Sequence, residues 1–186
     1  TETLVEESIR LLRGYEGEVK VLDVGTGSGA IAISIARYVP QALVYGVDIS
    51  EEALEVAKAN AVLNGVADRV FFYQSDLLDA VNFGTFQLIA ANLPYIPSEK
   101  MKDLPPEVRE YEPWQALDGG AGGLTFYKRL LPSAWQHLSM PGFLLLEVGD
   151  AAQAEELTRY ADEAWSGYYV LKDLGQRERV LVLKKG

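Results

Sequence analysis

Cysteine is absent from this chain, and histidine occurs only once, as His137. Without cysteine the chain has neither a disulfide framework nor a thiolate nucleophile, which fits a cytoplasmic location. With one histidine, a His-based metal centre and a Ser-His-Asp triad are both disfavoured, so we expect no metal site. We expect His137 itself to lie on the surface of a helix.

Long hydrophobic runs are missing as well. The apolar stretches are short and interrupted, far below the roughly 20 residues that span a bilayer, so we expect no membrane association. The first residues, Thr1-Glu2-Thr3-Leu4-Val5-Glu6-Glu7, are acidic, whereas a secretory signal begins with basic residues. Because the chain starts without methionine, we expect it to be a fragment or a processed form.

Basic residues are few in this chain. It has 17 Lys and Arg against 27 Asp and Glu, which gives a formal net charge of −10. Broad binding of nucleic acid depends on the neutralisation of phosphates by Lys and Arg. The charge balance therefore argues against such binding, although it leaves room for a small local basic patch.

The hydrophobic pattern predicts a single α/β domain over residues 1–186, because 186 residues with 48% hydrophobic side chains suffice for one sizeable core. Strand and helix patterns alternate, which predicts a doubly wound, seven-stranded, mostly parallel sheet covered on both faces. The predicted strands are residues 18–24, 42–49, 69–74, 86–91, 142–148, 168–174 and 179–184. The predicted helices are residues 3–13, 29–38, 51–63, 124–138 and 151–161. The last two strands leave no room for a helix between them, so they must form an antiparallel β-hairpin.

Several residues predict where helices begin or bend. Ser50 and Asp150 are expected N-caps, and Gln153 is placed for a capping box with Asp150. Pro132 is expected to kink or split its helix. Residues 96–123 are rich in Pro, Gly and charge and have no clear period, which predicts a long functional or mobile loop that closes over a substrate.

A glycine-rich segment, Asp23-Val24-Gly25-Thr26-Gly27-Ser28-Gly29-Ala30, joins the first predicted strand to the helix that follows. Glycines let the backbone approach a ligand closely, and the helix N-terminus supplies free N–H groups. Asp48 ends the second strand, where a carboxylate can accept hydrogen bonds from both ribose hydroxyls. Asp76 ends the third strand and is a candidate acceptor for an adenine amine, with Leu77 covering the adenine face. The predicted cofactor-binding residues are Asp23, Gly25, Thr26, Gly27, Ser28, Gly29, Asp48, Ile49, Asp76, Leu77 and Asn92.

The identity of the nucleotide needs further signals. Gly25, Gly27 and Ala30 also satisfy the dinucleotide pattern G-x-G-x-x-A, and Asp48 lies at a compatible distance. The tighter G-T-G-S-G loop and the C-terminal β-hairpin favour S-adenosylmethionine over NAD, because a dinucleotide fold continues with parallel units. A P-loop pattern, G-x-x-x-x-G-K-[ST], does not occur in the sequence.

The tetrapeptide Asn92-Leu93-Pro94-Tyr95 follows the fourth predicted strand. Such a turn suits a planar nitrogen with two N–H donors, either an amide or an exocyclic amine. The Asn92 side-chain oxygen accepts one N–H. Pro94 stiffens the turn so that backbone carbonyls can face the substrate, and the ring of Tyr95 offers a flat wall.

Together these segments resemble the class I S-adenosylmethionine-dependent methyltransferases. More narrowly, the chain resembles the catalytic domain of the peptide-release-factor glutamine N5-methyltransferases, the HemK family, over nearly its whole length. The most specific part of the resemblance is Pro106-Glu107-Val108-Arg109-Glu110-Tyr111-Glu112-Pro113, followed by Ala116-Leu117-Asp118-Gly119-Gly120. Adenine methyltransferases with Asn-x-Pro-Tyr do not generally share that stretch.

The resemblance implies transfer of a methyl group from S-adenosyl-L-methionine to the side-chain amide nitrogen (N5) of a glutamine in a peptide chain release factor. S-adenosyl-L-homocysteine is the implied product, and a monomer without direct nucleic-acid contact is the expected form. Asn92, Pro94 and Tyr95 are the implied catalytic residues, and Leu93 joins them in binding the substrate. Two departures are a leucine at position 93, where the family usually has proline, and the absence of the family's N-terminal helical domain.

Three enzyme classes compete with this interpretation. A nucleic-acid N6-adenine methyltransferase uses the same kind of amine grip, but acids outnumber bases between Ser98 and Glu112. A sister family methylates a glutamine of a ribosomal protein. An NAD-dependent oxidoreductase would share the glycine loop. A non-catalytic binding module is the weakest alternative, because every site position holds a chemically competent residue.

Overall fold

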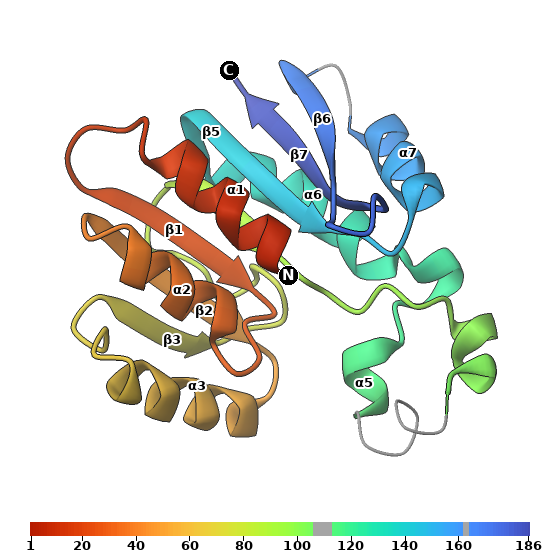
Figure 1. The fold of residues 1–186 in the computed structure, drawn as a ribbon, viewed down its shortest axis with the longest axis horizontal. Helices are drawn as coiled ribbons and strands as arrows, with labels where there is room; N and C mark the ends of the chain where they lie inside the picture. The colour runs from red at the N-terminus through yellow and green to blue at the C-terminus, as the bar shows by residue number, and fades with distance from the viewer. Residues whose placement is uncertain (106–112, 162–163) are drawn as a thin grey trace.

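Seven strands form one sheet in the computed structural model, which describes residues 1–105, 113–161 and 164–186. The strand order is β3-β2-β1-β4-β5-β7-β6, and every pair except β5–β7 and β6–β7 is parallel (Figure 1). The strands are β1 (Val19–Val24), β2 (Ala42–Asp48), β3 (Val70–Gln74), β4 (Phe86–Ala91), β5 (Leu138–Glu147), β6 (Gly167–Lys172) and β7 (Glu178–Lys185). The predicted α/β sheet and the predicted C-terminal hairpin are both confirmed.

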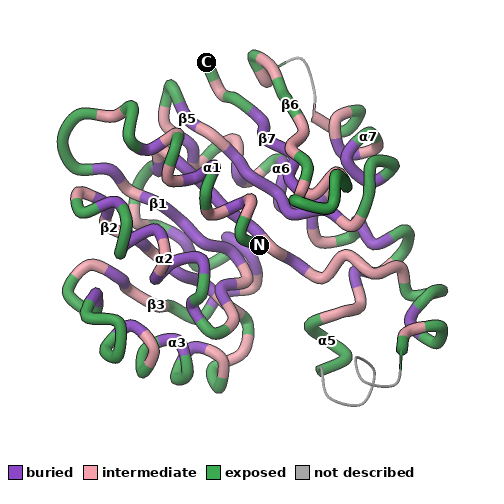
Figure 2. The backbone as a smooth tube through the Cα atoms, in the orientation of Figure 1, coloured by how far each residue is buried: buried purple, intermediate pink, exposed green. Residues whose placement is uncertain are grey.

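Helices cover both faces of this sheet and build two hydrophobic cores. One core contains the buried side chains of α1 (Glu2–Leu12), α2 (Ala30–Tyr38) and α3 (Glu51–Leu63), and the other those of α6 (Thr125–His137) and α7 (Ala151–Tyr160). Strand β1 contributes to both cores, since alternate side chains point to opposite faces of a sheet. The central strands are accordingly buried along most of their length (Figure 2).

The segment after β4 is more ordered than the sequence predicts. The expected long loop over residues 96–123 contains η1 (Ser98–Asp103), α5 (Trp114–Leu117) and η2 (Ala121–Gly123). The backbone of Gly119 donates to the carbonyl of Ile96 over 2.8 Å, which closes the base of this segment. Figure 1 shows it on the side toward which the parallel strands point. Residues 106–112, which belong to the stretch most specific to the family resemblance, lie outside the described residues.

Local predictions are partly confirmed. The Ser50 hydroxyl accepts from the backbone N–H of Ala53, as expected of an N-cap. Helix α6 runs through Pro132 as a single helix, so of the expected kink or split the split is wrong, and the kink stays a prediction. His137, at the end of this helix, is partly exposed, and its ring nitrogens lie 2.8 Å from the Ser133 carbonyl and 3.2 Å from the Val81 carbonyl.

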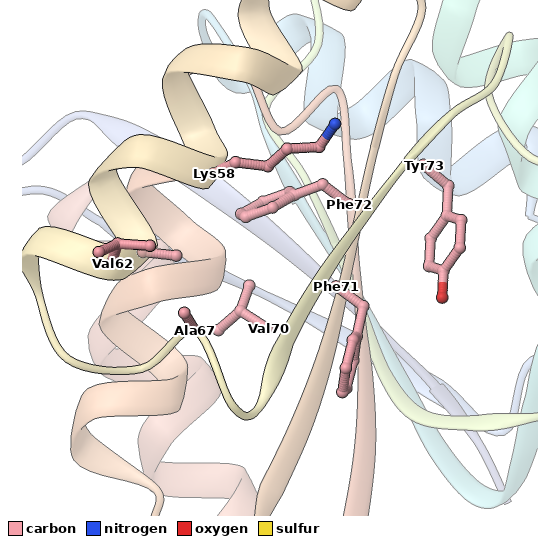
Figure 3. Close-up of a pocket in the computed structure, with 8 residues that line it drawn as sticks. Lys58, Val62, Ala67, Val70, Phe71, Phe72 and Tyr73 are labelled. Atoms are coloured by element: carbon pink, nitrogen blue, oxygen red, sulfur yellow. The ribbon is translucent and has the colours of Figure 1, made fainter.

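Across the part of the chain that the structure describes, no helix is both long enough and apolar enough to cross a membrane. A shallow cavity of about 290 Å³ lies at the β3 edge of the sheet, against α3. There Phe72 points toward α3 whereas Tyr73 points away from it (Figure 3). The cavity is lined mainly by apolar side chains and holds none of the predicted site residues.

Candidate functional site

The predicted site residues lie at or just after the carboxyl ends of β1, β2, β3 and β4, on both sides of the point where the order of the sheet reverses. Strands β1 and β4 are parallel neighbours in the middle of the sheet, and the chain continues outward from them in opposite directions. Val24 pairs with both Val47 and Ala91, so the residues after β1, β2 and β4 leave the sheet at one level. In open α/β sheets, ligands bind in the crevice at this switch point, beyond the carboxyl ends of the strands.

The glycine loop after β1 has the backbone that the sequence predicts. Gly25, Gly27 and Gly29 all have positive φ angles, 70°, 54° and 82°, in the left-handed region that favours glycine. A Cβ at Gly29 would lie 3.0–3.2 Å from three neighbouring side chains, whereas nothing lies within 4 Å of a Cβ at Gly27. The loop is therefore packed from beneath at Gly29, while the space above Gly27 is free for a ligand.

Asp48 holds this loop from the neighbouring strand. Its Oδ2 accepts from the backbone N–H of Gly27 over 2.8 Å, and its Oδ1 accepts from the N–H of Ser50 over 3.0 Å. A carboxylate oxygen can accept more than one hydrogen bond. Asp48 can therefore hold the loop and still accept hydrogen bonds from the hydroxyls of a bound ribose.

Asp23 is the buried acid beneath the loop. Its Oδ2 accepts from the hydroxyl of Thr26 over 2.6 Å and from the backbone N–H of Ala32 over 3.1 Å. Its Oδ1 is buried and has no hydrogen-bond partner within residues 1–105, 113–161 and 164–186. Burial, and to a smaller extent the charge of Asp48, raise the pKa of Asp23 to about 6.

We expect the substitution Asp23→Asn to reduce the pH dependence of stability. With a folded pKa of about 6 against a usual value of 3.8, the folded protein binds more protons than the unfolded chain between these values. The wild-type free energy of unfolding therefore falls as the pH rises through this window, by about 3 kcal/mol at most. Urea denaturation at about pH 4 and pH 7 measures this, and an equal loss in both proteins would contradict the role of Asp23.

Asp76 has a partner that the sequence did not suggest. Its Oδ2 lies 2.9 Å from Nη2 of Arg129, which α6 supplies. Leu77 beside it has a φ of 50° and a side chain that is only 9% exposed. The roles of Asp76 and Leu77 toward an adenine stay predictions, as does that of the exposed Ile49.

The turn 92–95 follows β4 and lies against the glycine loop. The side-chain nitrogen of Asn92 donates to the hydroxyl of Thr1 over 3.1 Å, which leaves its oxygen without a partner in the described part of the chain. Leu93 is buried, and one of its methyl carbons would lie 2.7 Å from a Cβ at Gly25. Leucine at this position thus fills the space directly behind the glycine loop and joins the two halves of the site.

Tyr95 ends the turn and packs beside the loop after β5. Its ring carbons come within 3.1 Å of the position of a Cβ at Gly149, so the glycine after β5 makes room for the ring. Burial, and then the nearby charge of Glu147, raise the pKa of Tyr95, which keeps its hydroxyl protonated near neutral pH.

Sequence reasoning missed two residues that hold the turn. The hydroxyl of Tyr127 is buried beside the backbone of Leu93, and the side chain of Gln153 bonds the carbonyl of Tyr95. Asp150 does cap α7, but the expected capping box is wrong, because the Gln153 side chain bonds Gly149 and the turn rather than the N–H of Asp150. The sequence signal at Gln153 was a polar residue at the third position of a helix, whereas Tyr127 gave none.

The strand order with an antiparallel β7, together with a glycine loop and acids at successive strand ends, defines a class I methyltransferase fold. A family model described as a methyltransferase domain matches residues 16–110, and the chain belongs to this family.

Curated relatives extend the match to nearly the whole chain. A release factor glutamine methyltransferase of Geobacter sulfurreducens is 38% identical over 97% of this chain and 62% of its own length. One of Moorella thermoacetica is 43% identical over 96% of this chain and 63% of its own length. This chain therefore spans less than two thirds of these relatives. A solved structure of a ribosomal protein L11 methylase from Lactobacillus delbrueckii subsp. bulgaricus is 25% identical with a TM-score of 0.70, over 100% of this chain and 79% of that one.

Proposed function

We propose that this chain transfers a methyl group from S-adenosylmethionine to the side-chain amide nitrogen of a glutamine in a peptide chain release factor. The observation that carries the proposal is the side-chain oxygen of Asn92, which lies beyond β4 and has no partner among the described residues. Leu93 beside it contacts the glycine loop, so an amide held at Asn92 would adjoin a nucleotide held by that loop. The names of the relatives support the choice of substrate.

The residues of the crevice fit S-adenosylmethionine. The open space above Gly27 suits a close approach of its amino-acid portion to the backbone, and Asp48 offers acceptors to its ribose. Asp23, buried beneath the loop, holds Thr26 and the start of α2 in place through its Oδ2. When bound, this cofactor supplies an electrophilic methyl group on a positively charged sulfur.

Asn92 and the backbone after it act on the nucleophile. A glutamine amide nitrogen is a weak nucleophile, because its lone pair is delocalised into the carbonyl. The Asn92 oxygen and a carbonyl at Leu93 or Pro94 would accept its two N–H groups and aim the lone pair at the methyl carbon. The same acceptors stabilise the positive charge that develops on nitrogen. The proposed rate acceleration therefore comes from orientation of the amide and from electrostatic stabilisation of the transition state.

The methyl transfer needs no strong base to deprotonate the amide nitrogen beforehand. In the transfer, a bond would form between the amide nitrogen and the methyl carbon while the carbon–sulfur bond would break, and its electron pair would stay on sulfur. The nitrogen then loses one proton to water, directly or through the oxygen of Asn92. Tyr95, half-buried against Gly149, walls this side of the crevice and limits the access of water.

A transfer assay with labelled S-adenosylmethionine tests the function directly. Purified release factor, ribosomal protein and RNA are offered in parallel, and mass spectrometry locates the methyl group. We expect label on one glutamine of the release factor. Label on RNA adenine or on a ribosomal-protein glutamine would overturn the proposed substrate, and binding of NAD in place of S-adenosylmethionine would overturn the class of reaction.

A further inference from the structure

We propose that Tyr127 and Gln153 are positioning residues that set the shape of the turn 92–95 and so aim its acceptor oxygens at the substrate amide. The proposal rests on the proposed function and adds two residues to its machinery. Both come from helices far away in the sequence, α6 and α7, and both act on the backbone of the turn. Neither is inferred to touch the substrate.

Tyr127 holds the first half of the turn. Its hydroxyl lies 2.5 Å from the carbonyl oxygen of Glu147 and 3.1 Å from that of Leu93, and it donates its one proton to either. The same oxygen accepts from the N–H of Leu93 over 3.3 Å. The side chain is fully buried, and burial holds its pKa well above the usual value, so the hydroxyl stays a donor. Tyr127 thus ties the peptide next to Asn92 to the end of β5.

Gln153 holds the second half of the turn. Its side-chain nitrogen donates to the carbonyl of Tyr95 over 2.8 Å and to that of Gly122 over 3.1 Å. Its oxygen accepts from the N–H of Gly149 over 2.9 Å. One nearly buried amide therefore joins the turn, the η2 segment and the loop after β5. An amide at this position uses both donors and its acceptor on backbone groups alone.

The space between these two anchors leaves the turn little freedom. A Cβ at Gly119 would lie 2.5 Å from the carbonyl oxygen of Pro94, and one at Gly123 would lie 2.0 Å from that of Tyr95. The η2 segment is therefore packed directly on the backbone of the turn, and Pro94 restricts its own φ. Tyr127 and Gln153 therefore restrain the two ends of the turn, and the close packing of Gly119 and Gly123 restrains the backbone between them.

Such a support matters because transfer depends on alignment. A displacement of about 1 Å in a reacting group can cost on the order of 10²-fold in rate. Loss of the Tyr127 hydroxyl would leave the N–H of Leu93 buried without its acceptor and release the turn from β5. The acceptor oxygens would remain present but would no longer be fixed, so the methyl-transfer step would suffer while the glycine loop and Asp48 would be untouched.

The test compares Tyr127→Phe with the wild-type chain, release factor and S-adenosylmethionine being the substrates. We expect kcat to fall roughly 10-fold or more, while the Kd for S-adenosylmethionine changes less than about twofold. Gln153→Met, which keeps the side-chain length and removes the amide, should behave in the same way. Tyr15→Phe removes a hydroxyl that donates to the Pro141 carbonyl outside the site and is the matched control. Thermal melts confirm that each variant is folded at the assay temperature.

A double-variant cycle separates positioning from general loosening. If Tyr127 acts through the turn, Tyr127→Phe should cost little further rate once Asn92→Ala has removed the acceptor it aligns. A full 10-fold loss in that background, or unchanged kcat in the single variant, would overturn the inference. A wild-type chain that binds S-adenosylmethionine but labels no glutamine would instead overturn the proposed function, so the two failures are distinguishable.

Discussion

Replacing Asn92 by alanine is expected to lower kcat by about 10²-fold or more and to leave the affinity for S-adenosylmethionine nearly unchanged. The unpartnered side-chain oxygen of Asn92 is the group best placed to accept an amide N–H, and the N–H of the next residue, Leu93, is held by the Tyr127 hydroxyl. Without it the substrate nitrogen keeps only a backbone acceptor and loses its alignment. Because the interaction strengthens as positive charge develops, the loss should appear in the chemical step.

Single-turnover methylation of a release factor at saturating cofactor measures this step. Asn82→Ala is the matched control, since Asn82 is exposed on the loop before β4 and away from the crevice. Isothermal titration of S-adenosylmethionine against both variants reports whether the cofactor site is intact. Turnover of Asn92→Ala near the wild-type value would remove Asn92 from the mechanism.

The sheet and the acids at the strand ends could be predicted from the sequence, because both depend on patterns within short segments. Short apolar runs bounded by glycine and charge predict strands, and parallel strands in alternation with helices place their carboxyl ends at one edge. Asp48 illustrates this: its position at the end of a strand was enough to place it at the same edge of the sheet as the glycine loop, and in the structure it accepts from the N–H of Gly27 over 2.8 Å. Ser50 is similar, because an N-cap depends only on its next few residues.

The residues that hold the turn 92–95 could not be predicted from the sequence, because their contacts join segments that are far apart along the chain. Gln153 has the spacing of a capping box, yet its side chain bonds Tyr95, which is 58 residues away. Three backbone groups from three segments, the carbonyls of Tyr95 and Gly122 and the N–H of Gly149, need a partner here, and this demand outweighs one local helix cap. Tyr127 gave no signal at all, since a tyrosine on the apolar side of a helix is ordinarily a core residue.

The leucine at position 93 shows how structure resolves a departure from a sequence pattern. A proline is the usual residue of the family at this position, and proline would supply stiffness through its fixed φ. Leu93 is instead buried against Gly25, with its backbone N–H and carbonyl both in contact with the Tyr127 hydroxyl. Leucine has an N–H that proline lacks, so side-chain packing and the Tyr127 hydroxyl together restrain the turn here.

Replacing Asp48 by alanine should have the opposite kinetic signature to the loss of Asn92. We expect the Kd for S-adenosylmethionine to rise roughly 10- to 100-fold, since hydrogen bonds to a charged acceptor contribute about 1.5–3 kcal/mol. Asp48 also accepts from the N–H groups of Gly27 and Ser50, so part of the effect comes through the shape of the glycine loop. At saturating cofactor, kcat should recover most of its wild-type value.

Two further variants separate the parts played by Asp48. Asp48→Asn keeps one oxygen for the loop and removes the charge, so we expect its affinity to lie between those of the wild type and Asp48→Ala. Asp68→Ala, which removes an exposed acid at the opposite end of the sheet, controls for the change in net charge. Titration calorimetry across the series gives the ordering. An unaltered affinity in Asp48→Ala would place the ribose elsewhere in the crevice, whereas a graded loss ties cofactor binding to the same carboxylate that shapes the loop.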